Sequence, residues 1–246
     1  MRTVTVDFWG TLLFDGPASD DRYRRTRVAD FERILAAAGE RATRSQLDRG
    51  YEASGVWLGR IWSRHRDVPV TDHVHAILAA VDPGLPERIP EPTLAALVHA
   101  YAQPALVVPP MVDDGARAAL EALRARGMTL ALVSNTMRTP GATLRRLLAH
   151  YGLLDCFAHT VFSDEIGVRK PDPEIFLHAL RAIGAEPQTA VHVGDDSVLD
   201  VQGARAAGMR TIQVTSRRTP APGSGPDAVI PRLAALPAVV ADLETR

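Results

Sequence analysis

The sequence predicts an α/β protein in which a doubly wound parallel sheet carries an inserted layer of α-helices. Two observations support this prediction. Between residues 105 and 246, short apolar runs alternate with amphipathic helical patterns, which is typical of a parallel sheet covered by helices on both faces. Between residues 16 and 104 the pattern is mostly helical. We therefore expect an α/β core formed by residues 1–15 and 105–246, and a helical domain over residues 16–104.

The first predicted element is a buried strand over residues 3–7, which ends on the carboxylate of Asp7. Four helical patterns follow in the insertion, separated by short breaks, of which the one over residues 86–92 is rich in proline. Gly39 is the expected stop of the first helix, and Thr71 is the expected N-cap of the third. The four helices are predicted over residues 21–39, 45–65, 71–82 and 90–102.

The rest of the chain predicts the remaining strands and their covering helices. Buried strands are predicted over residues 128–135, 159–164, 189–196, 210–215 and 227–230. Helices are predicted over residues 113–126, 140–150, 172–184, 197–208 and 232–243. The segment over residues 215–227 is rich in proline, glycine and serine, so we expect an exposed loop there.

The composition narrows the class of partner. The 246 residues carry a formal net charge of -1, so we expect no basic surface for nucleic acid or for an anionic membrane. No apolar run reaches the roughly 18 residues of a membrane span, and no secretion signal precedes the first strand. The single cysteine, Cys156, excludes an internal disulfide and fits a reducing compartment. We therefore expect a soluble cytoplasmic protein, and the composition leaves its oligomeric state open.

Polar side chains follow several predicted strands at the point where each strand ends. In an open parallel sheet, ligands bind beyond the carboxyl ends of the strands. Carboxylates there can hold Mg²⁺, while a lysine and a hydroxyl can hold the oxygens of a phosphoryl group. The pattern thus predicts a site for a small phosphorylated molecule. The residues are Asp7, Ser134, Asn135, Lys170, Asp195, Asp196 and Asp200.

In this order, these residues resemble the four motifs of the haloacid dehalogenase (HAD) superfamily. The matching stretches are "DFWGTL", "SN", Lys170-Pro171 and "GDDSVLD", and "DVQGARAAGM" after them also resembles the family. The resemblance covers residues 1–14 and about 105–240. It implies a Rossmann-like core, with the helical insertion as an α-helical cap.

The resemblance also implies a role for each motif residue. Asp7 would be the nucleophile that forms an aspartyl-phosphate, and Lys170 would assist it. The transferred group and the substrate would be bound by Trp9, Thr11, Ser134, Asn135 and Lys170. Mg²⁺ would be held by Asp7, Asp195 and the backbone carbonyl of Trp9, with Asp196 and Asp200 in support.

Trp9 departs from the phosphatase pattern. Phosphatases of the family usually carry a second Asp there, which protonates the leaving oxygen and activates the attacking water. Indole does neither, and an aromatic residue at this position resembles the metal-free 2-haloacid dehalogenases instead. The "GDD" motif and Asp200 favour a metal-dependent phosphatase, because a cation relieves the repulsion among these carboxylates. A dehalogenase and a slowed member that only binds a phosphorylated ligand stay as alternatives, which divalent-metal dependence would separate.

Several residues also have a purely structural interpretation. Asp196 is equally suited to a helix N-cap, and Arg169 to a solvated loop or to a pair with an acid. In the insertion, Tyr51, Trp57 and Trp62 at helical spacing predict core packing rather than substrate contact. The histidines of the insertion are expected to be ordinary surface or core residues rather than site residues; they are His65, His73, His75 and His99.

Overall fold

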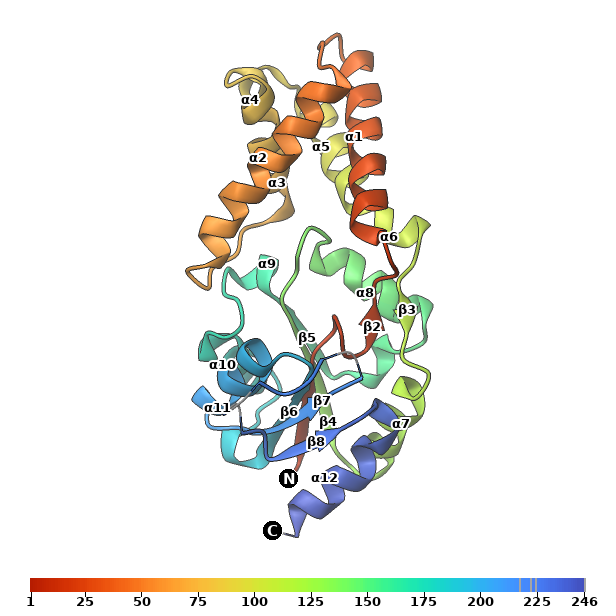
Figure 1. Ribbon diagram of the computed structural model, residues 1–246, viewed down its shortest axis with the longest axis vertical. Helices are drawn as coiled ribbons and strands as arrows, with labels where there is room; N and C mark the ends of the chain where they lie inside the picture. The colour runs from red at the N-terminus through yellow and green to blue at the C-terminus, as the bar shows by residue number, and fades with distance from the viewer. Residues whose placement is uncertain (217, 222, 224, 246) are drawn as a thin grey trace.

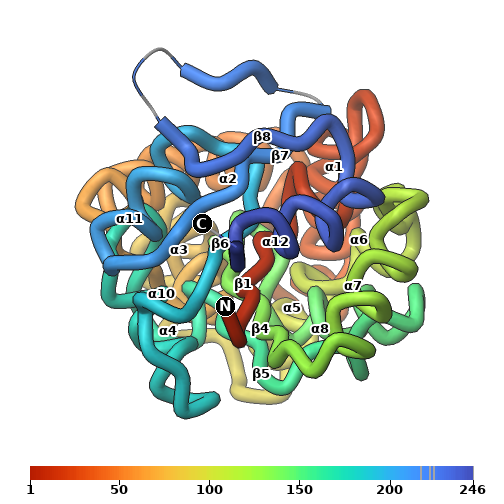
Figure 2. Tube along the Cα trace, turned by 90° about the horizontal axis from the view of Figure 1, so that it is seen from below, coloured from red at the N-terminus to blue at the C-terminus, as the bar shows by residue number. Residues whose placement is uncertain are grey.

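A six-stranded parallel sheet forms the centre of the core in this computed structural model, which describes residues 1–216, 218–221, 223 and 225–245. The strand order is β5-β4-β1-β6-β7-β8, and every adjacent pair runs parallel. The first strand of the chain therefore lies in the interior of the sheet (Figures 1 and 2). The strands are β1 (Thr3–Val6), β4 (Thr129–Ser134), β5 (His159–Phe162), β6 (Ala190–Gly194), β7 (Arg210–Val214) and β8 (Ala228–Ile230).

Helices cover both faces of this sheet, as Figure 2 shows from below. On one face lie α10 (Pro173–Ala182) and α11 (Gly203–Ala206), and on the other lie α7 (Ala116–Ala125), α8 (Gly141–His150) and α12 (Leu236–Glu244). Apolar side chains from the strands fill the core on both faces, although polar residues such as Thr5, His192 and Gln213 are buried among them. The predicted α/β class and its sheet are thus confirmed.

The helical insertion, defined as α1 to α5, lies above the carboxyl edge of the sheet (Figure 1). Its helices are α1 (Ser19–Ala37), α2 (Arg44–Trp62), α3 (Val70–Val81), α4 (Leu85–Arg88) and α5 (Glu91–Ala102). They bury an apolar cluster of their own, which includes Phe31, Leu47, Ile77 and Tyr101. This separate cluster explains why the insertion has an amphipathic helical pattern in sequence.

The short elements at the junctions were not predicted, because each is too short to show a period. They are α6 (Pro104–Val107), α9 (Ser163–Ile166) and an antiparallel pair formed by β2 (Leu13–Phe14) and β3 (Met111–Val112). The helix α4 was also not predicted. The prediction of Thr71 as an N-cap was wrong: α3 begins at Val70, after Pro69, and no side chain caps it. Pro69 itself occupies the N-cap position, and its carbonyl accepts from the N–H of Asp72 at 2.9 Å.

The predicted helix over residues 197–208 is a π-helical turn, Ser197–Gln202, followed directly by α11. Short 3₁₀ turns lie over Leu154–Cys156, Pro187–Thr189 and Leu233–Ala235. The predicted loop over residues 215–227 has no helix or strand in its described part, and its residues Arg217, Pro222 and Ser224 lie outside the described residues. No helix over the described part of the chain has both the length and the apolar character to cross a bilayer.

Candidate functional site

The predicted site residues meet at the carboxyl edge of the sheet, because parallel strands end at the same edge. Asp7 directly follows β1, Asn135 follows β4 and Asp195 follows β6. The backbone N–H of Asp7 donates to the carbonyl of Val193 at 2.9 Å, which fixes the start of the turn after β1. These residues and Lys170 line a cavity of about 680 Å³ between the sheet and the helical insertion.

Lys170 is the centre of a buried ionic network. Its ammonium donates to Oδ1 of Asp7 and, at 2.6 Å, to Oδ1 of Asp200. The Lys170 side chain is only 2% exposed. Asp200 also contacts Nε2 of His192 at 3.1 Å and accepts from the backbone N–H of Asp196 at 2.9 Å. Lys170 is therefore a fixed cation among carboxylates and not a solvated loop charge.

Asn135 holds Lys170 through its backbone. The Asn135 amide donates to the Lys170 carbonyl at 3.0 Å and accepts from the Lys170 N–H at 2.8 Å. Ser134 is fully buried, and its hydroxyl donates to the carbonyl of Asn135 at 3.2 Å. Thr11 is also fully buried, and its hydroxyl has no partner among the described residues. Of these three predicted binding residues, Asn135 alone lines the cavity.

Three carboxylates form a compact cluster. Asp7, Asp195 and Asp200 each offer an oxygen, and these atoms lie within 4.8 Å of one another. Oδ2 of Asp7 is buried and has no hydrogen-bond partner among the described residues. Gly10, at φ +80°, makes room for this approach, because a Cβ there would lie 2.5 Å from Oδ2 of Asp195. Clustered carboxylate oxygens with one unsatisfied atom fit a hard divalent cation such as Mg²⁺.

The pKa values indicate that Lys170, together with Arg218 at 3.1 Å from Asp195, does not balance this cluster. Burial raises the pKa of Asp7 to about 7, and the charges of Asp200 and Asp195 add to it against the opposing effect of Lys170. Burial and Asp200 raise the pKa of Asp195 to about 6. At Asp200, burial alone would raise the pKa, but Lys170 and His192 hold it well below its usual value. A further cation would therefore favour the ionised form of the cluster.

Trp9 lies in the cavity wall, whereas Asp196 caps a helical turn beside it. Trp9 lines the cavity, and its indole N–H has no partner among the described residues. The Trp9 ring packs edge-on against Phe8 at 4.8 Å between ring centroids. Asp196 caps the π-helical turn, since its Oδ1 accepts from the N–H groups of Val198 and Leu199, both at 2.9 Å. The N-cap interpretation of Asp196 is thus confirmed.

The cavity also contains two arginines that sequence reasoning missed, Arg27 on α1 and Arg138 in the loop after β4. Arg27 donates to the hydroxyl of Tyr51 at 3.0 Å and to the carbonyl of Arg138 at 2.8 Å. The Arg138 guanidinium lies over the Tyr51 ring at 3.9 Å. Both arginines line the cavity, and neither has a carboxylate partner in the described part of the chain. A signal for Arg27 did exist: it lies four residues before Phe31, on the apolar stripe of its helix.

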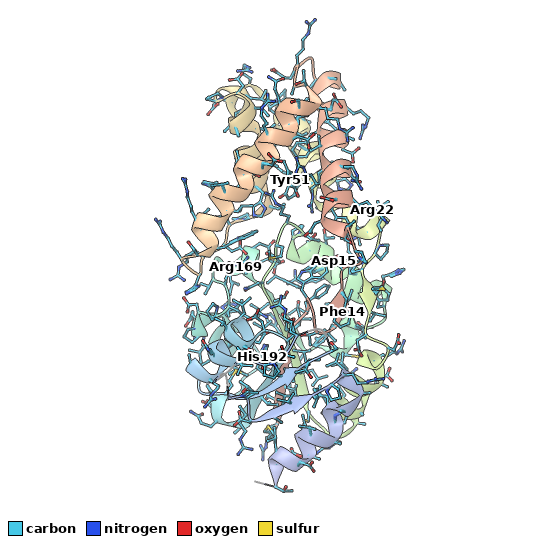
Figure 3. The ribbon with its side chains drawn as sticks, in the orientation of Figure 1. Phe14, Asp15, Arg22, Tyr51, Arg169 and His192 are labelled. Atoms are coloured by element: carbon cyan, nitrogen blue, oxygen red, sulfur yellow. The ribbon has the colours of Figure 1, made fainter. Side chains whose placement is uncertain are left out.

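The aromatic residues of α2 differ from the prediction. Tyr51 packs in the insertion as predicted, but it also lines the cavity, as does Trp62. Figure 3 shows Tyr51 in the insertion above the core, with Arg169 and Asp15 between the two layers. Trp57 is 36% exposed, so its assignment to the core was wrong. Trp57 lies on the solvent-exposed side of α2, next to the exposed Val56.

The structure also decides between the alternatives that the sequence left open for Arg169 and the histidines. Arg169 is buried and pairs with Asp67 at 2.6 Å, so the solvated alternative was wrong and the paired one is confirmed. The residues that line the cavity include no histidine. His73 is buried within the insertion, where burial lowers its pKa to about 4. These histidines therefore do not face the site.

Comparisons with known proteins agree with this architecture. A family model described as haloacid dehalogenase-like hydrolase matches residues 1–208. The chain is 32% identical to a phosphoserine phosphatase of Thermus thermophilus, over 92% of this chain and 94% of that protein. It is 31% identical to a phosphoglycolate phosphatase of Pseudomonas putida, over 96% of this chain and 78% of that protein.

A solved structure of a 2-haloacid dehalogenase from Pseudomonas syringae is similar over 99% of both chains, with a TM-score of 0.67 and 25% identity. Phosphatases and a dehalogenase thus both occur among the proteins that this chain resembles. The matched family model extends over most of the chain, from the first strand to the end of α11. The chain therefore belongs to the haloacid dehalogenase-like hydrolase family and is a hydrolase.

Proposed function

We propose that this hydrolase is a Mg²⁺-dependent phosphatase that acts on a small phosphorylated compound through an aspartyl-phosphate on Asp7. The observation that supports it is the buried cluster of Asp7, Asp195 and Asp200 beside Lys170, in a cavity between the sheet and the helical insertion. Two phosphatases among the relatives match nearly the whole chain. We also expect a cytoplasmic location, with the helical insertion acting as a cap over the site.

The proposed reaction begins with attack of the unpartnered Oδ2 of Asp7 on phosphorus. The bond between phosphorus and the ester oxygen breaks, and the leaving group takes its electron pair. Lys170 stabilises the negative charge of the transferred group. Asp7, Asp195 and the carbonyl of Trp9 would hold Mg²⁺, with Asp200 and Asp196 in support, and the ion would neutralise phosphate oxygens. Water then hydrolyses the acyl phosphate, which releases phosphate and restores Asp7.

A 2-haloacid dehalogenase is the second candidate, favoured by Trp9 and by the similarity to a dehalogenase structure. Halide leaves without a proton, so the absence of an acid at Trp9 costs that reaction less than it costs a phosphatase. Asp200 pairs with Lys170 and Asp195 with Arg218, but the carboxylate of a haloacid would add a further negative charge to this cluster, which is why we rank this function second. A slowed member that binds a phosphorylated ligand is the third. Halide release from 2-chloropropionate in the presence of a chelator would establish the dehalogenase.

The metal has its own test. We expect Mg²⁺ to bind, and Asp195→Ala to weaken the binding by more than about 100-fold, because the substitution removes a direct ligand. Asp200→Ala should weaken it by about 10-fold, since Asp200 is already committed to Lys170 and His192. Titration calorimetry with and without inorganic phosphate measures both effects. Wild-type protein that binds no Mg²⁺ in either condition would contradict the phosphatase proposal.

The cavity also indicates a substrate with a second anionic group. Arg27 and Arg138 are cations without a carboxylate partner in the described part of the chain, and they lie in the cavity wall formed with the insertion. A buried cation is costly unless an anion accompanies it. Phosphoserine and phosphoglycolate, named for two relatives, are both small phosphate esters that carry a carboxylate.

We therefore expect the wild type to prefer 4-carboxyphenyl phosphate to phenyl phosphate in kcat/KM. Arg27→Met should abolish this preference, a loss of about 10- to 100-fold for the charged substrate alone. Arg24→Gln is the matched control, because Arg24 lines the same cavity but already pairs with Asp48 at 3.0 Å and Glu52 at 2.8 Å. If Arg27→Met slows both substrates equally, Arg27 has a structural role only.

A further inference from the structure

Besides the contact between Arg138 of the core and Tyr51 of α2, the helical insertion meets the core at its two ends. At one end, the chain connections before α1 and after α5 join the two layers covalently. At the other end, the segment between α2 and α3, residues 63–69, reaches down to the core beside α9 (Figure 1). Two backbone hydrogen bonds fix this second contact: Asp67 N–H to the Gly167 carbonyl at 3.1 Å, and Arg169 N–H to the His65 carbonyl at 3.1 Å.

Asp67 makes the strongest interactions of this contact. Its side chain is 0% exposed and accepts from the Arg169 guanidinium at 2.6 Å, from the Thr136 hydroxyl at 3.3 Å and from the Ser163 hydroxyl. Within the insertion it also accepts from the Trp62 indole N–H at 2.9 Å. A single carboxylate of the insertion therefore binds three side chains of the core.

The core partners of Asp67 adjoin the residues that fix the lysine of the site. Thr136 follows Asn135, and Arg169 precedes Lys170. The Arg169 guanidinium also donates to the Thr136 carbonyl at 2.6 Å, so Asp67 and Arg169 tie the two segments together. The Asn135 amide makes a second tie, to the backbone N–H and carbonyl of Lys170. Both ties hold the same two stretches of backbone.

We infer that Asp67 is a positioning residue, which sets the place of Lys170 in the site by holding Arg169 and Thr136. Because Asp67 belongs to the insertion, this tie forms only while the insertion lies on the core. The Lys170 ammonium is therefore placed correctly only when the insertion has closed onto the core. The expected effect of Asp67 on kcat rests on the proposed function, whereas its expected effect on the backbone around Lys170 does not.

Without the Asp67 carboxylate, Arg169 would be a buried cation with no ion pair among the described residues, and the backbone that it holds would rearrange. A displacement of about 1 Å in a catalytic group costs on the order of 100-fold in rate. We therefore expect Asp67→Asn to lower kcat about 100-fold on a phosphate ester that the wild type accepts, with a much smaller change in KM. A residue that only docked the insertion would chiefly change KM.

The matched control is Arg66→Gln, in the same segment. Arg66 makes an exposed ion pair with Asp172 of the core at 2.7 Å, and exposed pairs contribute little. We expect kcat and KM of this variant to stay within about twofold of the wild type. Arg169→Lys serves as the second variant, since it keeps the charge, but the lysine side chain is one atom shorter than the reach to Nη1, the nitrogen that donates to both Asp67 and Thr136. We expect its loss of kcat to be intermediate.

Hydrogen exchange provides a readout independent of activity. The amide of Lys170 donates to Oδ1 of Asn135 at 2.8 Å in a buried setting, so its exchange reports the tie directly. Asp67→Asn should speed this exchange at least 10-fold, and Arg66→Gln should leave it unchanged. If Asp67→Asn leaves the Lys170 amide protected, or leaves kcat within twofold in an active protein, the inference is overturned. A wild type inactive on phosphate esters would refute the proposed function. The exchange of the Lys170 amide would then still test whether Asp67 positions Lys170.

Discussion

Asp7→Asn is expected to reduce turnover by at least about 10⁴-fold, the size of effect seen when a group that acts as a nucleophile is removed. The amide keeps the shape of the side chain but cannot attack phosphorus, and it loses the charge that would bind Mg²⁺. The fold should survive, because Lys170 keeps its ion pair with Asp200 at 2.6 Å. The raised pKa of Asp7, about 7, shows that its charge is costly in this setting, so we expect no fall in the melting temperature.

Single-turnover kinetics with a substrate that the wild type accepts measures this effect, and thermal unfolding checks the fold. Asp20→Asn is the control, because Asp20 lines the same cavity from α1 but is exposed and is not part of the carboxylate cluster. Its activity should be close to that of the wild type. An Asp7→Asn protein that retains more than a small residue of activity would show that another group attacks the substrate.

The sequence predicted the sheet and the floor of the site well, for the same physical reason. Strands buried on both faces are largely apolar, and parallel strands present their carboxyl ends at one edge. Asp7, Asn135 and Asp195 were therefore expected together before any geometry was known, and each of them lines the cavity. Short elements such as β2 and β3 have two residues each, which is too few to show a pattern.

The roof of the cavity was not predictable in the same way. Arg27 and Arg138 lie 111 positions apart, and Asp67 and Arg169 lie 102 positions apart. Nothing local in the chain indicates such partners, because a charged residue in a helix or loop is usually solvated. For Arg169 the paired alternative was considered, but its partner in the insertion was not identified. The packing of the two layers decides these contacts.

Trp9 leads to the second large effect. A site without a proton donor should depend strongly on the leaving group, since general acid–base catalysis contributes about 10²–10⁴-fold. The loss is greatest for alkyl phosphates, whose alkoxide leaves poorly without a proton, and small for acyl and aryl phosphates. We therefore expect measurable turnover of acetyl phosphate and p-nitrophenyl phosphate, and very poor turnover of sugar phosphates. The ratio of kcat/KM for aryl over alkyl substrates measures the effect.

Trp9→Asp should narrow this ratio about 10-fold or more by speeding the alkyl esters, because the carboxyl group can protonate the leaving oxygen. Trp9→Phe is the control: it removes the indole N–H, supplies no acid and should leave the ratio unchanged. A wild type that hydrolyses alkyl and aryl phosphates equally fast would show that another group supplies the proton. Asp15 would then be the residue to substitute, because it lines the cavity and burial raises its pKa, whereas no histidine lies among the residues that line it. Trp9 would in that case act on specificity, through its ring in the cavity wall.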